Sequence, residues 1–420
     1  MNRFRKSAAL SATLTLAAAL TACAGASTGS TGGDDGVFKV GLLLPSVGPF
    51  AGIAEDQADG FRHYVEDVAG GEFGDTEVEI VTGDEGNDPT IAQENVQRLV
   101  EKENVDALVG VISSAVAYAV APYIAESGVP TIFTATTADD LTQRQHAPNM
   151  FRVSNAASQI MLPLGEYACK DAGYKTAAMV SLDYSFGWEA MGGFAKAYED
   201  AGCTIKQELY TPLGTADWGS VAQSIDKSVD VIIQTSSGSD AAKFLQAYRD
   251  FGLSDIPMIA NGFGTDPSTL PEEAQRKLAT PVESVMYYAE ALDTPANNEF
   301  QESFQAKYSY TPGIYAEAAY VAGMVLDSAV ADLDDITYET LTEAISGVQI
   351  DDAPRGALQF DEYGQANLPV YLRKMKNVDG EFKNTVVTTL GEDLSQFWTF
   401  DPEEAMDEEP YNDLKGTWVK

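Results

Sequence analysis

The sequence predicts an α/β fold made of two similar lobes, each built on a parallel sheet flanked by helices. The chain has 420 residues, more than one ordinary hydrophobic core accommodates. Apolar strand-like runs alternate with helical patterns from residue 37 onward, which is typical of a doubly wound parallel sheet. This alternation starts again after residue 155, so we expect a second lobe of the same kind.

The first lobe begins with the apolar run 37–44, which predicts a buried strand. Apolar residues at helical spacing then predict a helix, and residues 78–81 predict a second strand. Asp88 followed by Pro89 is a typical helix start, with a capping carboxylate and proline in the first turn. Residues 151–153 form a short strand-like exit from this lobe.

Residues 110–142 form the central βαβ unit of the first lobe. The run 105–111 predicts a strand, an Ala-rich helix ends near Gly128, and 131–133 predicts the next strand. Pro122 either kinks this helix or marks a late start. Both strands end in small hydroxylated residues, at the edge where ligands bind to parallel sheets.

Ser113 and Ser114 stand between the first of these strands and the helix. Free amide groups and the helix dipole favour an anion there, so the pair predicts a cradle for a carboxylate. The alternative is ordinary helix capping by serine.

The second lobe repeats the alternation. We expect strands at 176–181, 204–210, 229–234, 258–260 and 282–289, with helices at 160–169, 187–200 and around 241–248. Later helices are expected at 297–308, 315–329 and 337–345, and late strands at 357–360 and 370–375. Residues 391–420 form an acidic extension that either packs on a lobe or trails as a tail.

The N-terminus predicts secretion and a lipid anchor. Residues 1–22 combine a basic start with an apolar stretch too short to span a bilayer, as in a signal peptide. Leu-Thr-Ala-Cys at 20–23 resembles a bacterial lipobox, which implies a diacylglycerol on Cys23. The alternative is a plain signal peptide. Residues 23–36 then form a flexible tether, and the protein is expected on the outer face of the cell membrane.

The net charge excludes some classes of partner, and the cysteines allow a disulfide. The formal net charge of −38 argues against nucleic acids and anionic membrane surfaces as partners. Cys169 and Cys203 are the remaining cysteines, and a disulfide between them is allowed but not required in an oxidising compartment.

Motifs for enzyme chemistry are missing from the sequence. No Gly-x-Ser-x-Gly elbow joins a predicted strand to a predicted helix, and the sequence has no His-Glu-x-x-His, no Cys-x-x-Cys and no phosphate loop. Its histidines, His63 and His146, leave a Ser-His-Asp arrangement open because such triads assemble in space. The acidic GDEGNDP at 83–89 lacks the spacing of a calcium loop, so capping and solvation are favoured. We expect no enzyme, no cofactor and no metal site.

Three segments of the second lobe follow predicted strands and are candidate ligand contacts. The segment DYSFG at 183–187 places two aromatic rings where a ligand wall is expected, although core packing is an equal alternative. The segments TSSGS at 235–239 and NGFG at 261–264 occupy equivalent positions.

The order and spacing of these segments resemble one known family. KVGLLLPSVGPFAG at 39–52, GDEGNDP, the 110–142 stretch, DYSFG and YAEAAYVAG at 315–323 are together similar to substrate-binding proteins of branched-chain amino acid ABC transporters. The resemblance implies a type I periplasmic-binding-protein fold of two Rossmann-like lobes joined by three hinge strands. It implies lobe 1 at 37–154 plus 289–354, and lobe 2 at 155–288 plus 355–390.

The resemblance also implies a ligand site in the cleft. Ser114, with Ser113 beside it, matches the serine that receives the ligand carboxylate. Ala135 and Thr137 match its partners in the next loop, and Phe186 matches an aromatic from the second lobe. Tyr184 and Phe263 add further rings that suit an aromatic ligand.

Two departures from the family concern the ligand's amino group. The family's acceptor Glu is replaced by Gly262 or Phe263, and Ser237 replaces a Tyr. A buried ammonium group without an acceptor is costly. Either Asp183 substitutes for the Glu, or the ligand lacks an amino group.

We therefore expect a monomeric, lipid-anchored binding protein that delivers a small carboxylate to an ABC permease and its ATPase. Branched-chain or other apolar amino acids are the first expectation, and aromatic or other organic acids the alternative. A ligand-sensing subunit of a signalling receptor is a second alternative, and a secreted hydrolase has no motif behind it.

Overall fold

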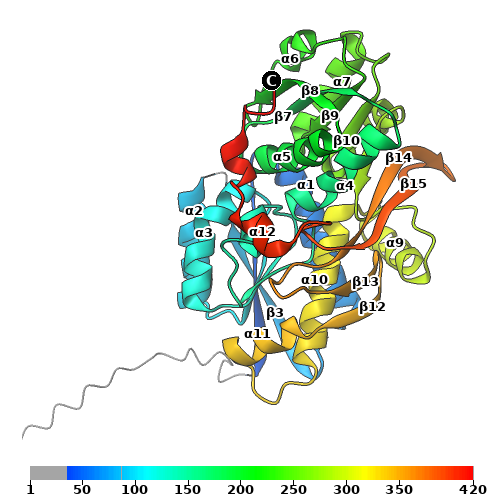
Figure 1. The fold of residues 1–420 in the computed structure, drawn as a ribbon. Helices are drawn as coiled ribbons and strands as arrows, with labels where there is room; N and C mark the ends of the chain where they lie inside the picture. Colours follow the sequence, from blue (N-terminus) through cyan, green and yellow to red (C-terminus); the bar gives the residue numbers. More distant parts are fainter. Residues whose placement is uncertain (1–35, 87, 420) are drawn as a thin grey trace, which may run out of the picture.

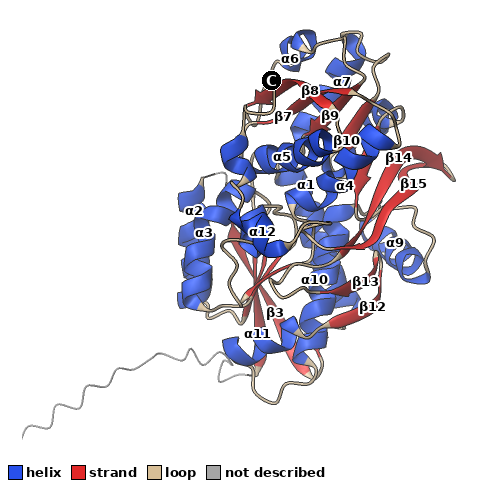
Figure 2. Ribbon diagram, in the orientation of Figure 1, coloured by secondary structure: helices blue, strands red, loops and turns tan. Residues whose placement is uncertain are grey.

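The computed structural model describes residues 36–86 and 88–419. Two sheet-containing lobes lie one above the other, and helices flank both sheets (Figure 1, Figure 2). The α/β architecture predicted from the sequence is confirmed. The predicted signal peptide at 1–22, the lipidation site Cys23 and all of the tether except its last residue lie outside the described residues.

Lobe 1, drawn lower in Figure 1, contains a six-stranded sheet in the order β2-β3-β1-β4-β5-β6. All neighbouring pairs except β2–β3 are parallel. The sequences of β1 and β4 are largely apolar, interrupted only by Lys39, because helices cover both faces of the sheet. The strands are β1 (Val37–Leu44), β2 (Glu72–Phe73), β3 (Thr76–Asp84), β4 (Ala107–Gly110), β5 (Thr131–Phe133) and β6 (Met150–Arg152).

The helices of lobe 1 come from both ends of the chain. A Cβ on Gly60 of α1 would lie 2.1 Å from the Ala316 carbonyl oxygen of α10, so only glycine permits this close crossing. Pro122 lies inside a helix that already begins at Ser114, which excludes the late start. The elements are α1 (Ala51–Arg62), the π-helix η1 (His63–Val68), α2 (Pro89–Glu101), α3 (Ser114–Ser127), η2 (Asp139–Thr142), α9 (Pro295–Tyr308), α10 (Ile314–Val330) and α11 (Tyr338–Ser346).

Lobe 2 contains a seven-stranded sheet in the order β15-β14-β11-β10-β9-β7-β8, in which β14 and β15 are antiparallel additions. Its strands are β7 (Thr176–Leu182), β8 (Thr204–Thr211), β9 (Val231–Thr235), β10 (Met258–Asn261), β11 (Glu283–Met286), β14 (Leu368–Val378) and β15 (Glu381–Leu394). Its helices are α4 (Ala157–Lys170), α5 (Ser185–Asp200), α6 (Trp218–Ser224), α7 (Ser239–Asp250), η3 (Gly262–Thr265) and α8 (Glu273–Ala279).

The chain passes between the lobes after β6, after β11 and after the hairpin β12 (Gln349–Ala353)–β13 (Gly356–Gln359). Two of these crossings are hydrogen-bonded to each other. The Arg152 N–H donates to the Gly364 carbonyl (2.8 Å), and the Ala366 N–H donates to the Arg152 carbonyl (3.0 Å). The buried Arg152 side chain donates from Nε to Gln365 Oε1 (2.5 Å), which ties the same two segments together.

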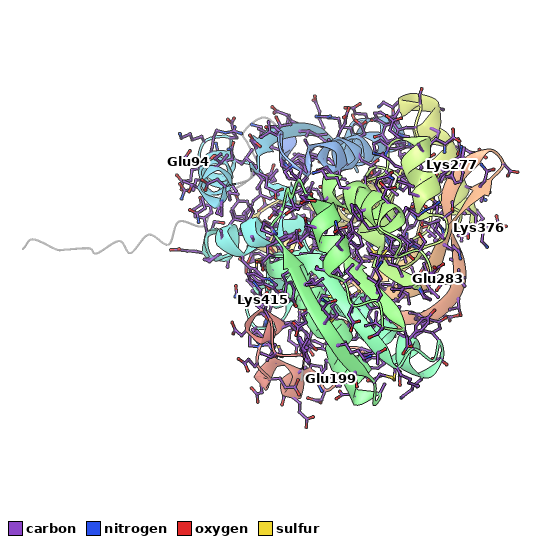
Figure 3. The ribbon with its side chains drawn as sticks, turned by 90° about the horizontal axis from the view of Figure 1, so that it is seen from above. Glu94, Glu199, Lys277, Glu283, Lys376 and Lys415 are labelled. Atoms are coloured by element: carbon purple, nitrogen blue, oxygen red, sulfur yellow. A yellow bond between two sulfur atoms is a disulfide. The ribbon has the colours of Figure 1, made fainter. Side chains whose placement is uncertain are left out.

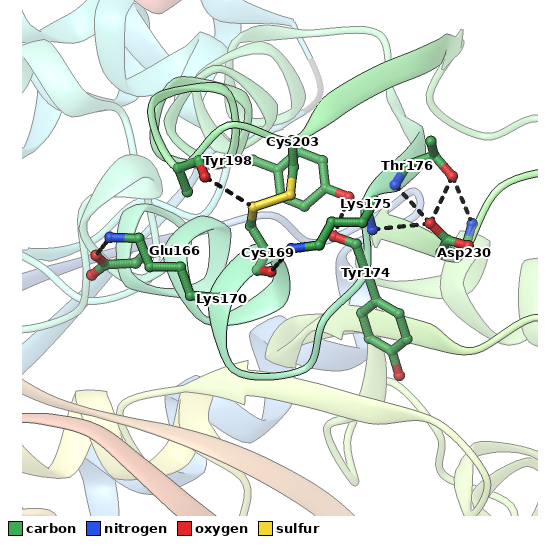
Figure 4. Close-up of a disulfide and its surroundings, with 10 residues drawn as sticks. Glu166, Cys169, Lys170, Tyr174, Lys175, Thr176, Tyr198, Cys203 and Asp230 are labelled. Carbon is green, nitrogen blue, oxygen red and sulfur yellow. Dashed lines mark hydrogen bonds and ion pairs between the residues drawn. A yellow bond between two sulfur atoms is a disulfide. The ribbon is translucent and has the colours of Figure 1, made fainter.

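A disulfide joins Cys169 and Cys203 at the edge of lobe 2 (Figure 4). Cys169 lies at the end of α4, and Cys203 directly precedes β8. Both lie at the end of the sheet where β7 and β8 begin, whereas the cleft lies at the opposite end, where the parallel strands terminate.

The C-terminal residues cross both lobes and do not trail as a tail. Residues 391–394, expected in the extension, continue β15. Residues 395–419, here called the C-terminal strap, then run over the seam between the lobes (red in Figure 1). The Arg144 guanidinium of lobe 1 donates to the carbonyls of Ala405, Met406 and Glu408 at 2.8–3.0 Å, around the end of α12 (Pro402–Asp407).

On lobe 2 the C-terminal strap is held by three carboxylates, one of which, Glu189, accepts from Asn412 Nδ2 (2.8 Å). Lys415 forms an ion pair with Asp183, and Glu208 accepts hydrogen bonds from the backbone of residues 416, 418 and 419 at 2.8–3.0 Å. Charged side chains such as Glu94, Lys277 and Lys376 lie at the periphery of the molecule (Figure 3). Within the described ranges, no helix is long and apolar enough to cross a membrane.

Candidate functional site

The candidate site lies between the lobes, where β4 and β5 end. The chain turns sharply after β4, with φ of +130° at Gly110 and +61° at Val111. A Cβ on Gly110 would lie 2.3 Å from the Leu43 carbonyl oxygen, so this close approach to β1 requires glycine. The turn leads directly into Ser114, the first residue of α3.

Ser114 lies at the centre of a buried hydroxyl cluster. Its Oγ accepts hydrogen bonds from the Thr137 N–H (3.3 Å) and the Thr136 hydroxyl (3.4 Å), and lies 3.5 Å from Thr137 Oγ1. Ser113 occupies the capping position of α3, but its side chain makes no capping hydrogen bond. The cluster therefore presents neutral donors at the end of the cleft nearest α3.

Aromatic rings form the opposite wall. The ring centroids of Tyr184 and Phe186 lie 5.8 Å apart, those of Phe186 and Phe263 5.9 Å, and those of Phe263 and Tyr315 5.3 Å with nearly parallel planes. Tyr184 is also hydrogen-bonded to Ser237, and burial is the main reason that the pKa of Tyr184 is raised. Tyr315 comes from α10 of lobe 1, so the wall is built from both lobes.

Together these groups enclose a cavity of about 10 Å³, the room of roughly one water molecule. A ligand with a ring therefore enters only when the lobes separate or the rings turn. Among the described residues, none that lines the cavity is charged. Its lining consists of Phe50, Ile112, Ser114, Ala135, Thr137, Tyr184, Phe186, Ser237, Phe263 and Tyr315.

Seven of the predicted site residues thus meet in one cavity, and two lie outside it. Ser113 is not part of the lining. Asp183 was a candidate acceptor for an ammonium group, but it faces the C-terminal strap, where it accepts from Trp188 Nε1 (2.9 Å) and pairs with Lys415. Burial pushes the pKa of Asp183 up, but the hydrogen bonds from Lys415 and Trp188 outweigh it and leave the pKa lowered.

Gly262 has no room for the side chain of an acceptor. A Cβ there would lie 2.5 Å from Arg373 Nη2 and 2.6 Å from Met286 Cβ. The next residue, Phe263, places its ring in the cavity instead. The region therefore offers an apolar surface to the ligand and no carboxylate.

Sequence reasoning missed three lining residues and one buried carboxylate. Phe50 and Tyr315 lie within segments that carried the family resemblance, but nothing in the local pattern directs them to the cavity. Ile112 precedes the Ser-Ser pair. Glu85 is fully buried, and burial raises its pKa to about 8 although it accepts two backbone hydrogen bonds, from Ile112 and Ser113.

The acidic segment around Glu85 holds no metal-binding cluster, and none occurs elsewhere among the described residues. Asp84 accepts hydrogen bonds from the N–H groups of Ser46 (3.0 Å) and Gly86 (2.8 Å). Asp88 caps α2 by accepting from the Thr90 N–H (2.9 Å). Both residues thus serve local structure, as the sequence favoured.

One Ser-His-Asp contact exists, far from the cleft. His63 Nδ1 lies 3.0 Å from Asp67 Oδ2, and Nε2 lies 2.8 Å from Ser303 Oγ. The Ser303 hydroxyl also donates to the Glu299 carbonyl of its own helix (2.7 Å), and neither His63 nor Ser303 is part of the cavity lining.

Three comparisons with known proteins bear on the site. A family model described as periplasmic binding protein matches residues 37–381. The chain is similar to Leu/Ile/Val-binding protein homolog 6 of Brucella melitensis biotype 1, with 30% identity over 386 residues, 88% of this chain and 96% of the relative.

Two solved structures have the same fold and a known ligand. One is a solute binding protein of an ABC transporter from R. palustris in complex with benzoate, with 30% identity and a TM-score of 0.80 over 86% of this chain and 98% of that one. The other, from Rhodopseudomonas palustris HaA2, is in complex with p-hydroxybenzoic acid, with 26% identity and a TM-score of 0.78 over 85% and 98% of the two chains.

Proposed function

Because this chain belongs to the periplasmic binding protein family and is a solute-binding protein of the ABC-transporter type, we propose that its cleft captures a small aromatic carboxylate. The observation that carries the proposal is the cavity lining. It combines buried hydroxyl groups at one end with aromatic rings at the other, and it contains no charged side chain.

The hydroxyl end suits the carboxylate. Ser114 and Thr137 supply neutral donors beside the N-terminus of α3, whose dipole favours a negative charge. Phe186, Phe263 and Tyr315 suit a flat ring, since aromatic pairs contribute about 0.5–1.5 kcal/mol beyond the area that they bury.

An amino acid is the less favoured ligand. Its ammonium group would be buried without a carboxylate partner, because Asp183 faces the C-terminal strap and Gly262 carries no side chain. The name of the Brucella relative keeps leucine, isoleucine and valine as the competing class.

A thermal-shift panel of matched pairs tests the proposal. 3-Phenylpropanoate and phenylalanine differ only in the amino group, as do 4-methylpentanoate and leucine, and benzoate and 4-hydroxybenzoate complete the panel. The mature chain is first stripped of ligand by unfolding and refolding. Ligand at about 100 times its Kd stabilises by roughly 2.7 kcal/mol. The acids without an amino group should raise Tm, and larger shifts with leucine and phenylalanine would contradict the proposal.

A substitution pair localises the binding. Ser114→Trp fills the hydroxyl end of the cavity and should abolish the shift, whereas Ser113→Ala, one residue away and outside the lining, should retain it. Wild-type affinity in Ser114→Trp would place the ligand elsewhere.

We further propose that binding closes the two predicted lobes, 37–154 plus 289–354 and 155–288 plus 355–390, as a ligand-biased population shift. A monomer with a diacylglycerol on Cys23 would then present the ligand to an ABC permease and its ATPase at the outer face of the membrane. Cys23→Ser should release the protein into the medium, and continued membrane attachment would contradict the lipid anchor.

A further inference from the structure

The carboxylate of Glu85 accepts hydrogen bonds from the backbone directly before α3. Its Oε1 accepts from the Ser113 N–H (2.7 Å), and its Oε2 accepts from the Ile112 N–H (2.8 Å). Ser113 is the N-cap of α3 and Ile112 precedes it, so Glu85 lies just before the first turn of the helix, which begins at Ser114. The chain's own carboxylate therefore fixes the backbone that leads into Ser114.

Glu85 also ties down a strained turn. Val111 has φ of +61°, a left-handed backbone conformation that a β-branched residue rarely adopts. Four hydrogen bonds hold the turn. The Val111 N–H donates to the Leu43 carbonyl (3.0 Å), and the Val111 carbonyl accepts from the Thr136 N–H (3.0 Å). Glu85 accepts from the next two amides of the chain. Ser114 follows immediately, so this turn sets where its Oγ lies relative to Thr137.

We propose that Glu85 is a positioning residue for ligand binding: it acts through the 110–113 turn, holds Ser114 at the cavity, and makes carboxylate binding depend on a proton. The proposal rests on the proposed function, because it assigns the ligand carboxylate to the hydroxyl end. Glu85 reaches the ligand only through Ile112, Ser113 and Ser114, since its own side chain is not part of the lining.

The proton dependence follows from the charges around Glu85. The groups that face it are Asp84 on the same strand end and Tyr184 across the cavity, and neither is a cation. Burial raises the pKa of Glu85 to about 8, and a bound carboxylate adds a second negative charge close by. Protonated Glu85 is therefore favoured in the complex, so ligand affinity is highest below this pKa and falls as the pH rises through it.

The test compares Glu85→Gln with a matched control, Asp106→Asn. Asp106 is also a buried carboxylate of lobe 1 that accepts a backbone hydrogen bond (Lys39 N–H, 2.7 Å), but it precedes β4 at the end away from the cavity. Calorimetric titration with benzoate is performed from pH 6.5 to 9.5 on wild type and both variants. Hydrogen exchange of the 108–118 segment is measured without ligand.

In wild type we expect benzoate affinity to fall up to tenfold per pH unit above pH 8. Glu85→Gln should bind at least tenfold more weakly at pH 7, because its amide nitrogen cannot accept from a backbone N–H, and its affinity should not vary with pH. Asp106→Asn should lower Tm but keep the wild-type Kd and pH profile.

Two results would overturn the inference. One is a Glu85→Gln variant with the wild-type Kd and pH profile. The other is unchanged hydrogen exchange in the 108–118 segment of that variant, which requires no ligand. A third outcome is that wild type binds no acid of the panel while hydrogen exchange in Glu85→Gln still becomes faster. In that case the proposed function fails, but the stabilisation of the turn by Glu85 is supported.

Discussion

Removal of the Cys169–Cys203 disulfide should lower the free energy of unfolding by an amount that depends on the number of residues between the two cysteines. The bond closes a loop with a separation of 34 residues within lobe 2. In the chain-entropy description, a loop of this length constrains the unfolded chain by about 4 kcal/mol at 25 °C. With an unfolding entropy of about 2.1 cal/mol/K per residue, the double variant Cys169→Ala/Cys203→Ala should melt about 5 °C lower.

Calorimetric unfolding of the oxidised protein, the reduced protein and the double variant measures this loss. The reduced protein is the matched control, because it keeps both side chains while losing the bond. Ligand affinity at 25 °C should be unchanged, since the disulfide lies at the end of lobe 2 away from the cavity. A Tm change below 1 °C would refute the loop-entropy reasoning, and a changed Kd would show that this edge of lobe 2 is coupled to the cleft.

Three further perturbations address the contact between the lobes. Gly238→Ala places a Cβ 2.3 Å from the Pro49 carbonyl oxygen of the other lobe, so the lobes cannot approach as closely. Calorimetry should therefore show at least a tenfold loss of benzoate affinity. Unchanged affinity would contradict the closed arrangement. Arg144→Ala removes three hydrogen bonds from the guanidinium to carbonyls of the C-terminal strap, and a hydrogen bond from a charged donor contributes roughly 1.5–3 kcal/mol. Amide hydrogen exchange in residues 395–419 should therefore become faster. Unchanged exchange would contradict this role of Arg144. Glu189 of α5 accepts hydrogen bonds from the Tyr118 hydroxyl and the Asp139 N–H of lobe 1. Burial and the nearby Asp139 raise the pKa of Glu189, so its protonated form is favoured when the lobes are in contact. The contact between the lobes should therefore become more stable as the pH falls. X-ray scattering should show a smaller radius of gyration at pH 5.5 than at pH 8, with no difference in Glu189→Gln.

The β/α alternation was predictable because parallel strands buried on both faces appear as largely apolar runs, as in β1 and β9. The family membership is likewise confirmed. By contrast, no strand was predicted where β15 lies. Its residues are mostly half-exposed, as expected for an antiparallel edge, and its Thr- and Glu-rich sequence carries little apolar signal.

Local sequence indicated the hydroxyl end of the site, because small hydroxylated residues follow two apolar strands. The family resemblance then singled out Ala135 and Thr137 there. Residues whose roles depend on distant segments were not predictable in this way. Asp183 follows β7 in the position of a ligand contact, yet its partner Lys415 lies 232 residues further along the chain. Tyr315 enters the cavity from α10, and no pattern near it indicates which side of that buried helix faces lobe 2.

The close crossing of α1 and α10 has a consequence for how the protein is made. Helix α1 is complete once Arg62 has been synthesised, whereas its partner α10 does not exist until Val330 has been added. Contacts between such distant segments form slowly, and apolar surface that waits for its partner is prone to aggregation. Lobe 1 therefore stays open on one side while β7 to β11 of lobe 2 are being made. A chain interrupted anywhere in between would carry an unfinished first core, and lobe 2 in turn waits for β14 and β15.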